Sequence, residues 1–323
     1  MINKKVLFLA FAFTIFVSLV SPALADVTYM LVGSWEVPGV GRIAVDSAGS
    51  IYVTGNAIWK YLSSGGLDST WGTNGAADGQ LKAVIDIGID TNKNVYVAQT
   101  EGWMNGAIIK FNSTGSQLGN WGSILYNGPT ALHVQSSGKV YAVFTLGSNP
   151  IMLYTFDTNG AVTAKKTMQG WPWSHGFLAV DSAGNFYLDD CAGNITKRNA
   201  DGQTILATYN YGMMNSMNER AAVDLSGNVY VLKSMGIDDH IQIFKSGGTK
   251  IGKIKMPTTK QPSNFIDIAI KSDGSELYEL GAGQTSGQSI IYKYVRNINY
   301  PTNQYYNAIP KKPITKINPI IIH

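Results

Sequence analysis

The chain has 323 residues, of which only 14% are charged, and its formal net charge is +4. So small an excess of positive charge does not favour binding to nucleic acid or to an anionic membrane surface. The 35 glycines and 17 tyrosines, combined with few charges, favour turn-rich β structure over helix.

The first 25 residues have the features of a secretory signal peptide. Lys4 and Lys5 precede an apolar run over residues 6–20, and the small-x-small sequence Ala-Leu-Ala follows at residues 23–25. The apolar run is shorter than the about 20 residues of a membrane-spanning helix. We therefore expect cleavage before Asp26 and secretion to the extracellular space or the periplasm. No second long apolar run follows, so no membrane span is predicted.

One phrase recurs six times in residues 26–296. It joins a short apolar run, a polar turn with Gly, and a second apolar run with Tyr near its start, as in IAVDSAGSIYVT (43–54) and LAVDSAGNFYLD (178–189). Repeats of about 40–50 residues are typical of β-propeller blades. The recurrent tyrosines are Tyr52, Tyr96, Tyr141, Tyr187, Tyr230 and Tyr278.

Each repeat has the pattern of four short strands. A third apolar run and a Gly-containing turn lead to a fourth run, such as TILATYN (204–210) or KIGKIKM (250–256). The Asp of the Asp-Ser-Ala-Gly turn can accept backbone N–H groups, while Gly takes a positive φ. We interpret these aspartates as turn caps rather than metal ligands. They are Asp46, Asp90, Asp181 and Asp224.

The last repeat lacks a fourth strand after its runs at 266–270, 276–281 and 289–296. The segment YMLVGSW (29–35) is a spare strand, and its Ser-Trp ending matches the Trp endings of other fourth runs. We therefore predict an all-β fold, a six-bladed β-propeller of four-stranded antiparallel blades closed by the N-terminal strand. Residues 297–323, rich in Pro and Lys, are predicted to form an extended tail.

The repeats are similar to NHL repeats. In these, Gly-apolar-Ala-Val-Asp, a Gly turn and apolar-Tyr-Val precede apolar-Gln-apolar-Phe and Gly. GRIAVDSAGSIYVT with AIWKYLSSGG, and AAVDLSGNVYV with IQIFKSGG, carry this resemblance, which covers residues 28–296. It implies a six-bladed, TolB-like propeller. NHL-type propellers include both binding proteins and enzymes, so the resemblance implies the fold more strongly than the function.

Departures from the repeat are the better guide to function. The residues before the innermost strands gather at one mouth of the central channel in such a ring, and four of them are charged: Arg42, Asp86, Arg220 and Asp267. They can hold a polar ligand or pair with each other across neighbouring blades. His133 stands where the other copies have Ala or Gly, and it either reaches into the channel or is buried and hydrogen-bonded.

Aromatic side chains form the third departure. Trp171, Trp173 and His175 lie in one blade-to-blade connection, and Trp103 lies in a loop between the second and third strands of its blade. Exposed tryptophans suit a stacking platform for a sugar or a peptide, although a packed loop explains them equally.

The ligand classes that fit these candidates are a protein, a peptide or a glycan, and we expect a monomeric binding module rather than an enzyme, with no cofactor. The alternative is a metal-dependent lyase or lactonase. His175-Gly176 followed by FLAVDSAG resembles the His-Gly pattern of peptidyl amidating lyases. Glu36-Val37-Pro38 resembles an early Glu-Gly-Pro of gluconolactonase-like propellers. His175 with Glu219 resembles the His/Glu pair of virginiamycin B lyase-like propellers.

Overall fold

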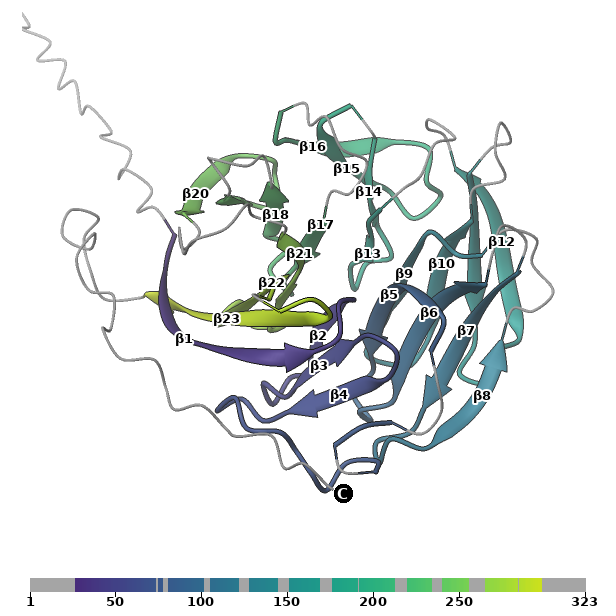
Figure 1. Cartoon of the computed structure of the whole chain (residues 1–323). Helices are drawn as coiled ribbons and strands as arrows, with labels where there is room; N and C mark the ends of the chain where they lie inside the picture. Colours follow the sequence, from purple (N-terminus) through teal and green to yellow (C-terminus); the bar gives the residue numbers. More distant parts are fainter. Residues whose placement is uncertain are drawn as a thin grey trace, which may run out of the picture.

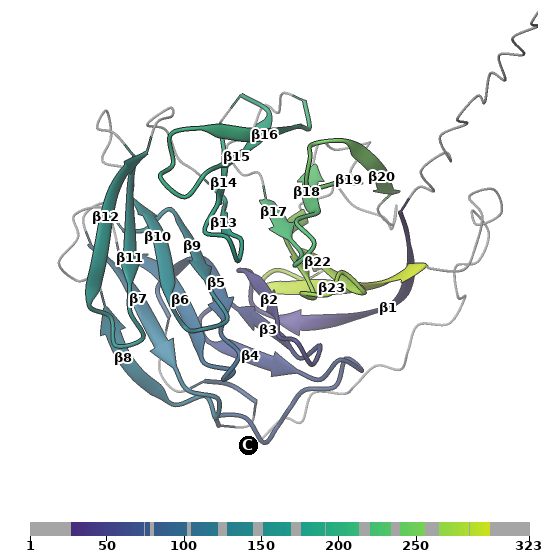
Figure 2. The same cartoon turned by 180° about the vertical axis from the view of Figure 1, so that it is seen from behind.

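The computed structural model shows an all-β ring of six blades, numbered 1 to 6 from the repeat at residue 43 (Figure 1). The same ring is seen from behind in Figure 2. This confirms the predicted fold. The structure describes residues 27–73, 75–77, 81–101, 105–121, 128–144, 151–168, 176–190, 192–212, 220–233, 240–255, 265–283 and 285–297.

In each blade the first strand lies nearest the axis of the ring, and the next strands follow outward (Figure 1). Blade 1 contains β2 (Ile43–Val45), β3 (Ile51–Thr54) and β4 (Ile58–Tyr61). Blade 2 contains β5 (Ala83–Ile89), β6 (Val95–Glu101), β7 (Asn105–Phe111) and β8 (Gln117–Trp121). Blade 3 contains β9 (Ala131–Val134), β10 (Val140–Phe144), β11 (Ile151–Phe156) and β12 (Val162–Met168).

The second half of the ring repeats this order. Blade 4 contains β13 (Leu178–Val180), β14 (Phe186–Asp189), β15 (Asn194–Arg198) and β16 (Ile205–Asn210). Blade 5 contains β17 (Arg220–Val223), β18 (Val229–Lys233), β19 (His240–Phe244) and β20 (Lys250–Lys255). Blade 6 contains β21 (Phe265–Ile270), β22 (Glu276–Ala282), β23 (Gln288–Asn297) and the N-terminal β1 (Thr28–Pro38).

The N-terminal strand closes the ring, as predicted. β1 pairs antiparallel with β23 from Thr28 opposite Asn297 to Pro38 opposite Gln288, and the two strands lie side by side in Figure 1. Just before β1, the Val27 backbone N–H donates to the Ile251 carbonyl of β20 over 3.0 Å. The first residues of β1 therefore join blades 5 and 6, and the outer edge of β23 is covered.

Blade 1 departs from the predicted four strands. Its regular sheet has three strands, and the outer position is taken by residues 67–73 and 75–77, which make isolated bridges such as Trp59 with Ala76 and Tyr61 with Leu67. The Lys60 ammonium pairs with the Asp68 carboxylate over 2.9 Å, which ties this irregular segment to β4.

The core consists of six apolar clusters, one at each seam between neighbouring blades. At the seam between blades 1 and 2, for example, Tyr52 and Ile58 pack with Val95 and Val97. Each sheet thus buries the inner part of both faces against its neighbours. Inner strands such as β10 and β14 are therefore buried at every residue, whereas outer strands such as β20 alternate between buried and exposed residues.

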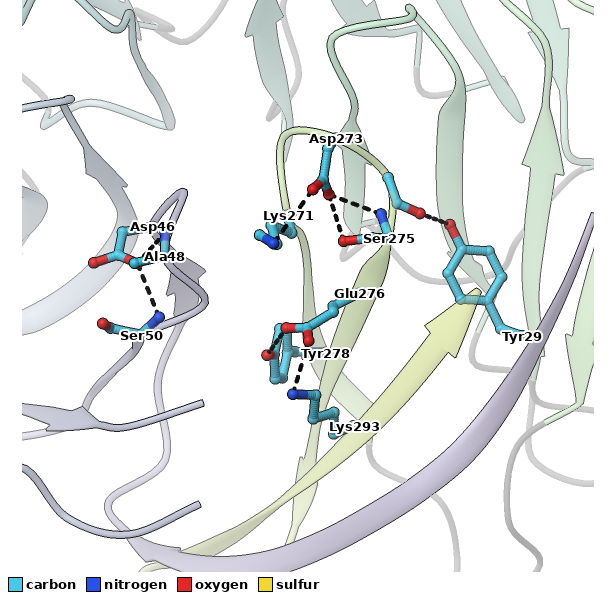
Figure 3. Close-up of polar contacts among 11 residues, drawn as sticks. Tyr29, Asp46, Ala48, Ser50, Lys271, Asp273, Ser275, Glu276, Tyr278 and Lys293 are labelled. Carbon is cyan, nitrogen blue, oxygen red and sulfur yellow. Dashed lines mark hydrogen bonds and ion pairs between the residues drawn. The ribbon is translucent and has the colours of Figure 1, made fainter. Parts of the chain in front are cut away.

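The repeated phrase builds the first contact across these seams. The Asp46 carboxylate caps its turn by accepting the N–H groups of Ala48 and Ser50 over 2.9 and 2.8 Å (Figure 3). Asp90 caps the turn of blade 2 in the same way and also accepts the Tyr96 hydroxyl over 3.0 Å. These contacts confirm the aspartates as turn caps.

The same group then meets the turn glycine of the next blade. A Cβ built on Gly138 of blade 3 lies 3.1 Å from both the Asp90 carboxylate and the Tyr96 hydroxyl of blade 2. At the closing seam, Lys271 stands at the aspartate position, and Glu276 instead binds the Tyr278 hydroxyl and the Lys293 ammonium (Figure 3). Glu276 also faces Gly49 of blade 1. The polar residues of one repeat therefore stabilise the turn of their own blade and also contact the turn glycine of the next blade.

Tryptophans of the outer segments form a second repeated seam contact. The rings of Trp35, Trp71 and Trp121 lie against the glycine of the third-to-fourth strand turn in the next blade, which is Gly65, Gly115 and Gly160, respectively. These glycines all have φ near +90°. The sequence predicted that the segment at 29–35 corresponds to the other fourth strands because some of them also end in Trp. The structure agrees, since the three tryptophan rings occupy corresponding seams.

Candidate functional site

Four charged side chains stand at the start of innermost strands on one face of the ring, here called the axial face. They are Arg42 of blade 1, Asp86 of blade 2, Arg220 of blade 5 and Asp267 of blade 6, and we name them the axial cluster. The equivalent positions of blades 3 and 4 hold Ala131 and Phe177, both buried. Four of the six positions at the axial face are thus charged, and the two in blades 3 and 4 are apolar.

The two aspartates are held by backbone N–H groups. The Asp86 carboxylate accepts from its neighbour Ile87 over 2.9 Å and from Leu132 of blade 3 over 2.8 Å. Asp267 repeats the arrangement, accepting from Ile268 over 2.9 Å and from Ile43 of blade 1 over 3.0 Å. Each carboxylate therefore uses one oxygen on its own strand and the other on the next blade.

A β-bulge sets the position of both aspartates. The pairing of β5 with β6 shifts between Val84 and Asp86, and that of β21 with β22 shifts between Phe265 and Asp267. The extra residues are Ile85 and Ile266, whose backbone groups leave the regular ladder. The sequence carried a signal for this feature that sequence reasoning missed, since the tripeptide Ile-Asp-Ile occurs at both places.

The two arginines also bind backbone of neighbouring blades. Arg42 donates its Nε–H to the carbonyl of the bulged Ile85 over 2.6 Å, so the bulge in blade 2 supplies the acceptor for blade 1. Arg220 of blade 5 donates through Nη1 to the Gly176 carbonyl of blade 4. Within the described residues no direct ion pair joins members of the axial cluster, in contrast to the predicted Arg–Asp pairs.

The four charges nevertheless act on one another. Burial raises the pKa of Asp86 to about 6, and the negative Asp267 adds to this effect, whereas Arg220 and Arg42 oppose it. Burial also raises the pKa of Asp267. Burial and then the positive Arg220 lower the pKa of Arg42. The cluster is therefore one electrostatic unit that spans four consecutive blades.

Donors and acceptors are not equally satisfied in this unit. Every carboxylate oxygen of Asp86 and Asp267 accepts a backbone hydrogen bond. Arg220 is only 7% exposed, yet its buried Nε–H has no acceptor among the described residues. Leaving a buried donor unpaired costs roughly 1–3 kcal/mol. The terminal amino groups of Arg42 likewise make no hydrogen bond in the described part of the chain.

His133 lies at the seam between blades 3 and 4. The corresponding residues face the next blade, as Gly88 faces Val134 and Ala269 joins the cluster around Ile43. The His133 ring lies 6.5 Å from that of Tyr141, and burial lowers its pKa to about 4, against a smaller effect of the Val180 backbone. The side chain is therefore neutral at pH 7 and belongs to a seam.

Five sequence candidates lie outside the described residues, so their arrangement stays a prediction. These are Trp103, Trp171, Trp173, His175 and Glu219. Topology alone assigns Trp171, Trp173, His175 and Glu219 to connections that lead into β13 and β17, the strands that begin at the axial face.

No protein-family model matches the chain, and no curated protein matches it. In the described ranges, no group of three His, Cys, Asp or Glu side chains is placed to hold a metal ion. The same ranges contain no apolar helix long enough to cross a bilayer. The described structure therefore directs attention to the axial cluster, which can offer hydrogen-bond donors to a ligand.

Proposed function

We propose that the chain is an exported NHL-type β-propeller that acts as a binding module, with its axial face as the surface that takes a protein, peptide or glycan. The observation that carries this proposal is the uneven hydrogen bonding of the axial cluster. The Arg220 Nε–H is buried without an acceptor and the terminal amino groups of Arg42 make no hydrogen bond in the described part of the chain, whereas each oxygen of the two aspartates accepts one backbone N–H. Buried donors are usually satisfied, because unpaired ones are costly. The seam residues Trp35 and Trp71 also leave a buried N–H unpaired, but Arg220 is a cation and is therefore the group that favours a negatively charged acceptor.

Two further features support the axial face. The residues before the innermost strands are arginine in two blades, aspartate in two and apolar in two, whereas on the opposite, turn-bearing side an aspartate cap recurs in blades 1, 2, 4 and 5. The connections with Trp171 and Trp173 precede β13, and aromatic side chains are frequent anchors of binding surfaces. The ligand would thus meet both charged and aromatic groups.

Glycan and peptide arrays probed with the purified mature chain test this proposal. A hit should be lost in the double variant Trp171→Ala/Trp173→Ala and retained in Leu225→Ala, a control on the turn side where Leu225 is 79% exposed. If the hit survives the tryptophan changes and is lost with Leu225→Ala, the binding surface is on the other side of the ring and the proposal is wrong.

Metal analysis addresses the enzymatic alternative separately. A metal that co-purifies in a one-to-one ratio and disappears in His175→Ala would favour a metal-dependent lyase or lactonase over a binding module. The axial arginines would then serve to orient a substrate.

A further inference from the structure

We propose that the axial cluster binds an oxyanion, a carboxylate or phosphate group of the ligand, between the guanidinium groups of Arg42 and Arg220. This inference rests on the proposed binding function and narrows it to one recognised chemical group. The first argument for it is the asymmetry of the cluster, in which Arg220 and Arg42 keep N–H groups without an acceptor among the described residues while each aspartate oxygen already accepts one backbone hydrogen bond. A site of that kind lacks an acceptor, which an oxyanion supplies.

The geometry of the arginines supports an anion rather than a neutral ligand. Each guanidinium uses one N–H group to fix itself on a carbonyl of a neighbouring blade, Arg42 on Ile85 and Arg220 on Gly176. These bonds orient the planar groups before a ligand arrives. Both terminal amino groups of Arg42 keep the fork shape that matches carboxylate and phosphate oxygens, and Arg220 adds a positive charge whose Nε–H has no acceptor in the described structure.

The bulged carbonyl of Ile85 and the backbone bonds of the aspartates explain why the arginines stay available. Asp86 and Asp267 are the carboxylates that act electrostatically on Arg42, yet each of their oxygens accepts a backbone N–H and none is paired directly with a guanidinium group. The carboxylates therefore compensate the positive charge at a distance without occupying the forks. An anion completes the hydrogen bonding that the cluster itself leaves open.

Protonation of Asp86 should adjust the affinity. The charged groups that act on Asp86 are Arg220, Asp267 and Arg42, and its pKa is about 6. Below that pH the cluster has one negative charge fewer and attracts an anion more strongly. We therefore expect acetate, which stays ionised, to bind more tightly at about pH 6 than at about pH 8.

Calorimetric titration with acetate and with inorganic phosphate tests the site, and the two probes show which oxyanion it prefers. Wild-type protein should bind at least one of them. Arg42→Gln and Arg220→Gln should each weaken binding roughly tenfold or more. Arg42→Lys, which keeps the charge and loses the fork, should also weaken it. Lys165→Gln removes the same charge from the outer strand β12, where Lys165 lies over Tyr154, and should have no effect.

Several outcomes would overturn the inference. Absence of binding by the wild type overturns it without reference to any variant, so misfolding of an arginine variant leaves the test intact. Equal loss in Lys165→Gln would show that net charge rather than the cluster attracts the anion. Affinity that does not vary with pH, or that varies equally in Asp86→Asn, would remove Asp86 from the site. An array hit that depends on Trp171 and Trp173 would still support the binding function if both anions failed.

Discussion

The turn side of the ring and its axial face use polar side chains in opposite ways. On the turn side, the Asp90 carboxylate accepts hydrogen bonds from a backbone N–H of its own turn and from the Tyr96 hydroxyl. Asp224 makes the same contacts in blade 5. On the axial face, the residue at the corresponding position changes from blade to blade. Arg42 and Asp86, for example, each make a hydrogen bond with the backbone of a neighbouring blade. Repetition thus marks contacts that stabilise seams, while the departures from it include the donors of Arg42 and Arg220 that we propose for ligand binding.

The largest effect is expected for Gly160→Ala at a turn-side seam. Gly160 has φ +88°, and a Cβ there would lie 2.4 Å from the Trp121 ring. Left-handed backbone and overpacking together should lower the free energy of unfolding by about 4 kcal/mol. Urea denaturation followed by circular dichroism measures this change.

Gly184→Ala is the matched control for that substitution. Gly184 has φ +80°, but a Cβ there meets only the Ala200 Cβ at 3.6 Å, an ordinary contact. Its cost should be limited to the backbone term, about 1 kcal/mol. Similar losses in both variants would mean that the tryptophan contact contributes little to the seam.

A second prediction concerns pH and two buried groups, Asp86 of the axial cluster and His133 at the seam between blades 3 and 4. The pKa of Asp86 is raised to about 6, so this group makes the fold less stable as pH rises from about 4 to 6, by about 2–3 kcal/mol. The pKa of His133 is lowered to about 4, so this group makes the fold more stable as pH rises from about 4 to 6.5, by a similar amount. The two effects oppose each other, and Asp267 acts in the direction of Asp86.

Single substitutions should separate these opposing effects. His133→Gln should make the free energy of unfolding fall more steeply between about pH 4.5 and 6.5, whereas Asp86→Asn should make it rise relative to the wild type. Urea denaturation at a series of pH values shows the slopes. Identical slopes in the two variants would contradict the assignment of both groups. Lower pH is avoided because Asp181 and Glu276, whose pKa values are lowered, lose their stabilising charge there.

A smaller effect is expected where the tyrosine hydroxyl meets the turn aspartate. Tyr96→Phe removes the bond to Asp90 at a buried seam and should cost about 1 kcal/mol. In blade 3 the aspartate is replaced by Gln135, and Tyr141 makes no such bond in the described structure, so Tyr141→Phe should cost less than about 0.5 kcal/mol. Equal costs would show that the ring rather than the hydroxyl stabilises the seam.

The sequence predicted most of the fold because repeated residues report repeated geometry. The spacing of the tyrosines gave the six blades, and the spare segment at 29–35 gave the closure by β1. The irregular outer segment of blade 1 was not predicted, because its bridges depend on Trp59 and Tyr61 in the finished blade.

The axial cluster was only partly predictable. Arg42, Asp86, Arg220 and Asp267 were identified from their place before the innermost strands, since that place follows from topology. Their partners were not, because the direct Arg–Asp pairs expected from charge alone compete with backbone groups. The bulge at Ile85 frees a carbonyl for Arg42, and the start of each next blade offers an N–H group to the aspartates.

The smallest effect is expected at Lys93, where blade 2 departs from the turn rule. Lys93 has φ 62°, and its N–H donates to the Asp90 carbonyl over 3.0 Å, as Gly49 does to Asp46 in blade 1. Lys93→Gly should raise the free energy of unfolding by about 0.5 kcal/mol, because relief of the left-handed backbone exceeds the added entropy of the unfolded chain. Lys93→Ala loses the same side chain without relieving the backbone. A gain in both variants in urea denaturation would assign the effect to the lysine charge instead.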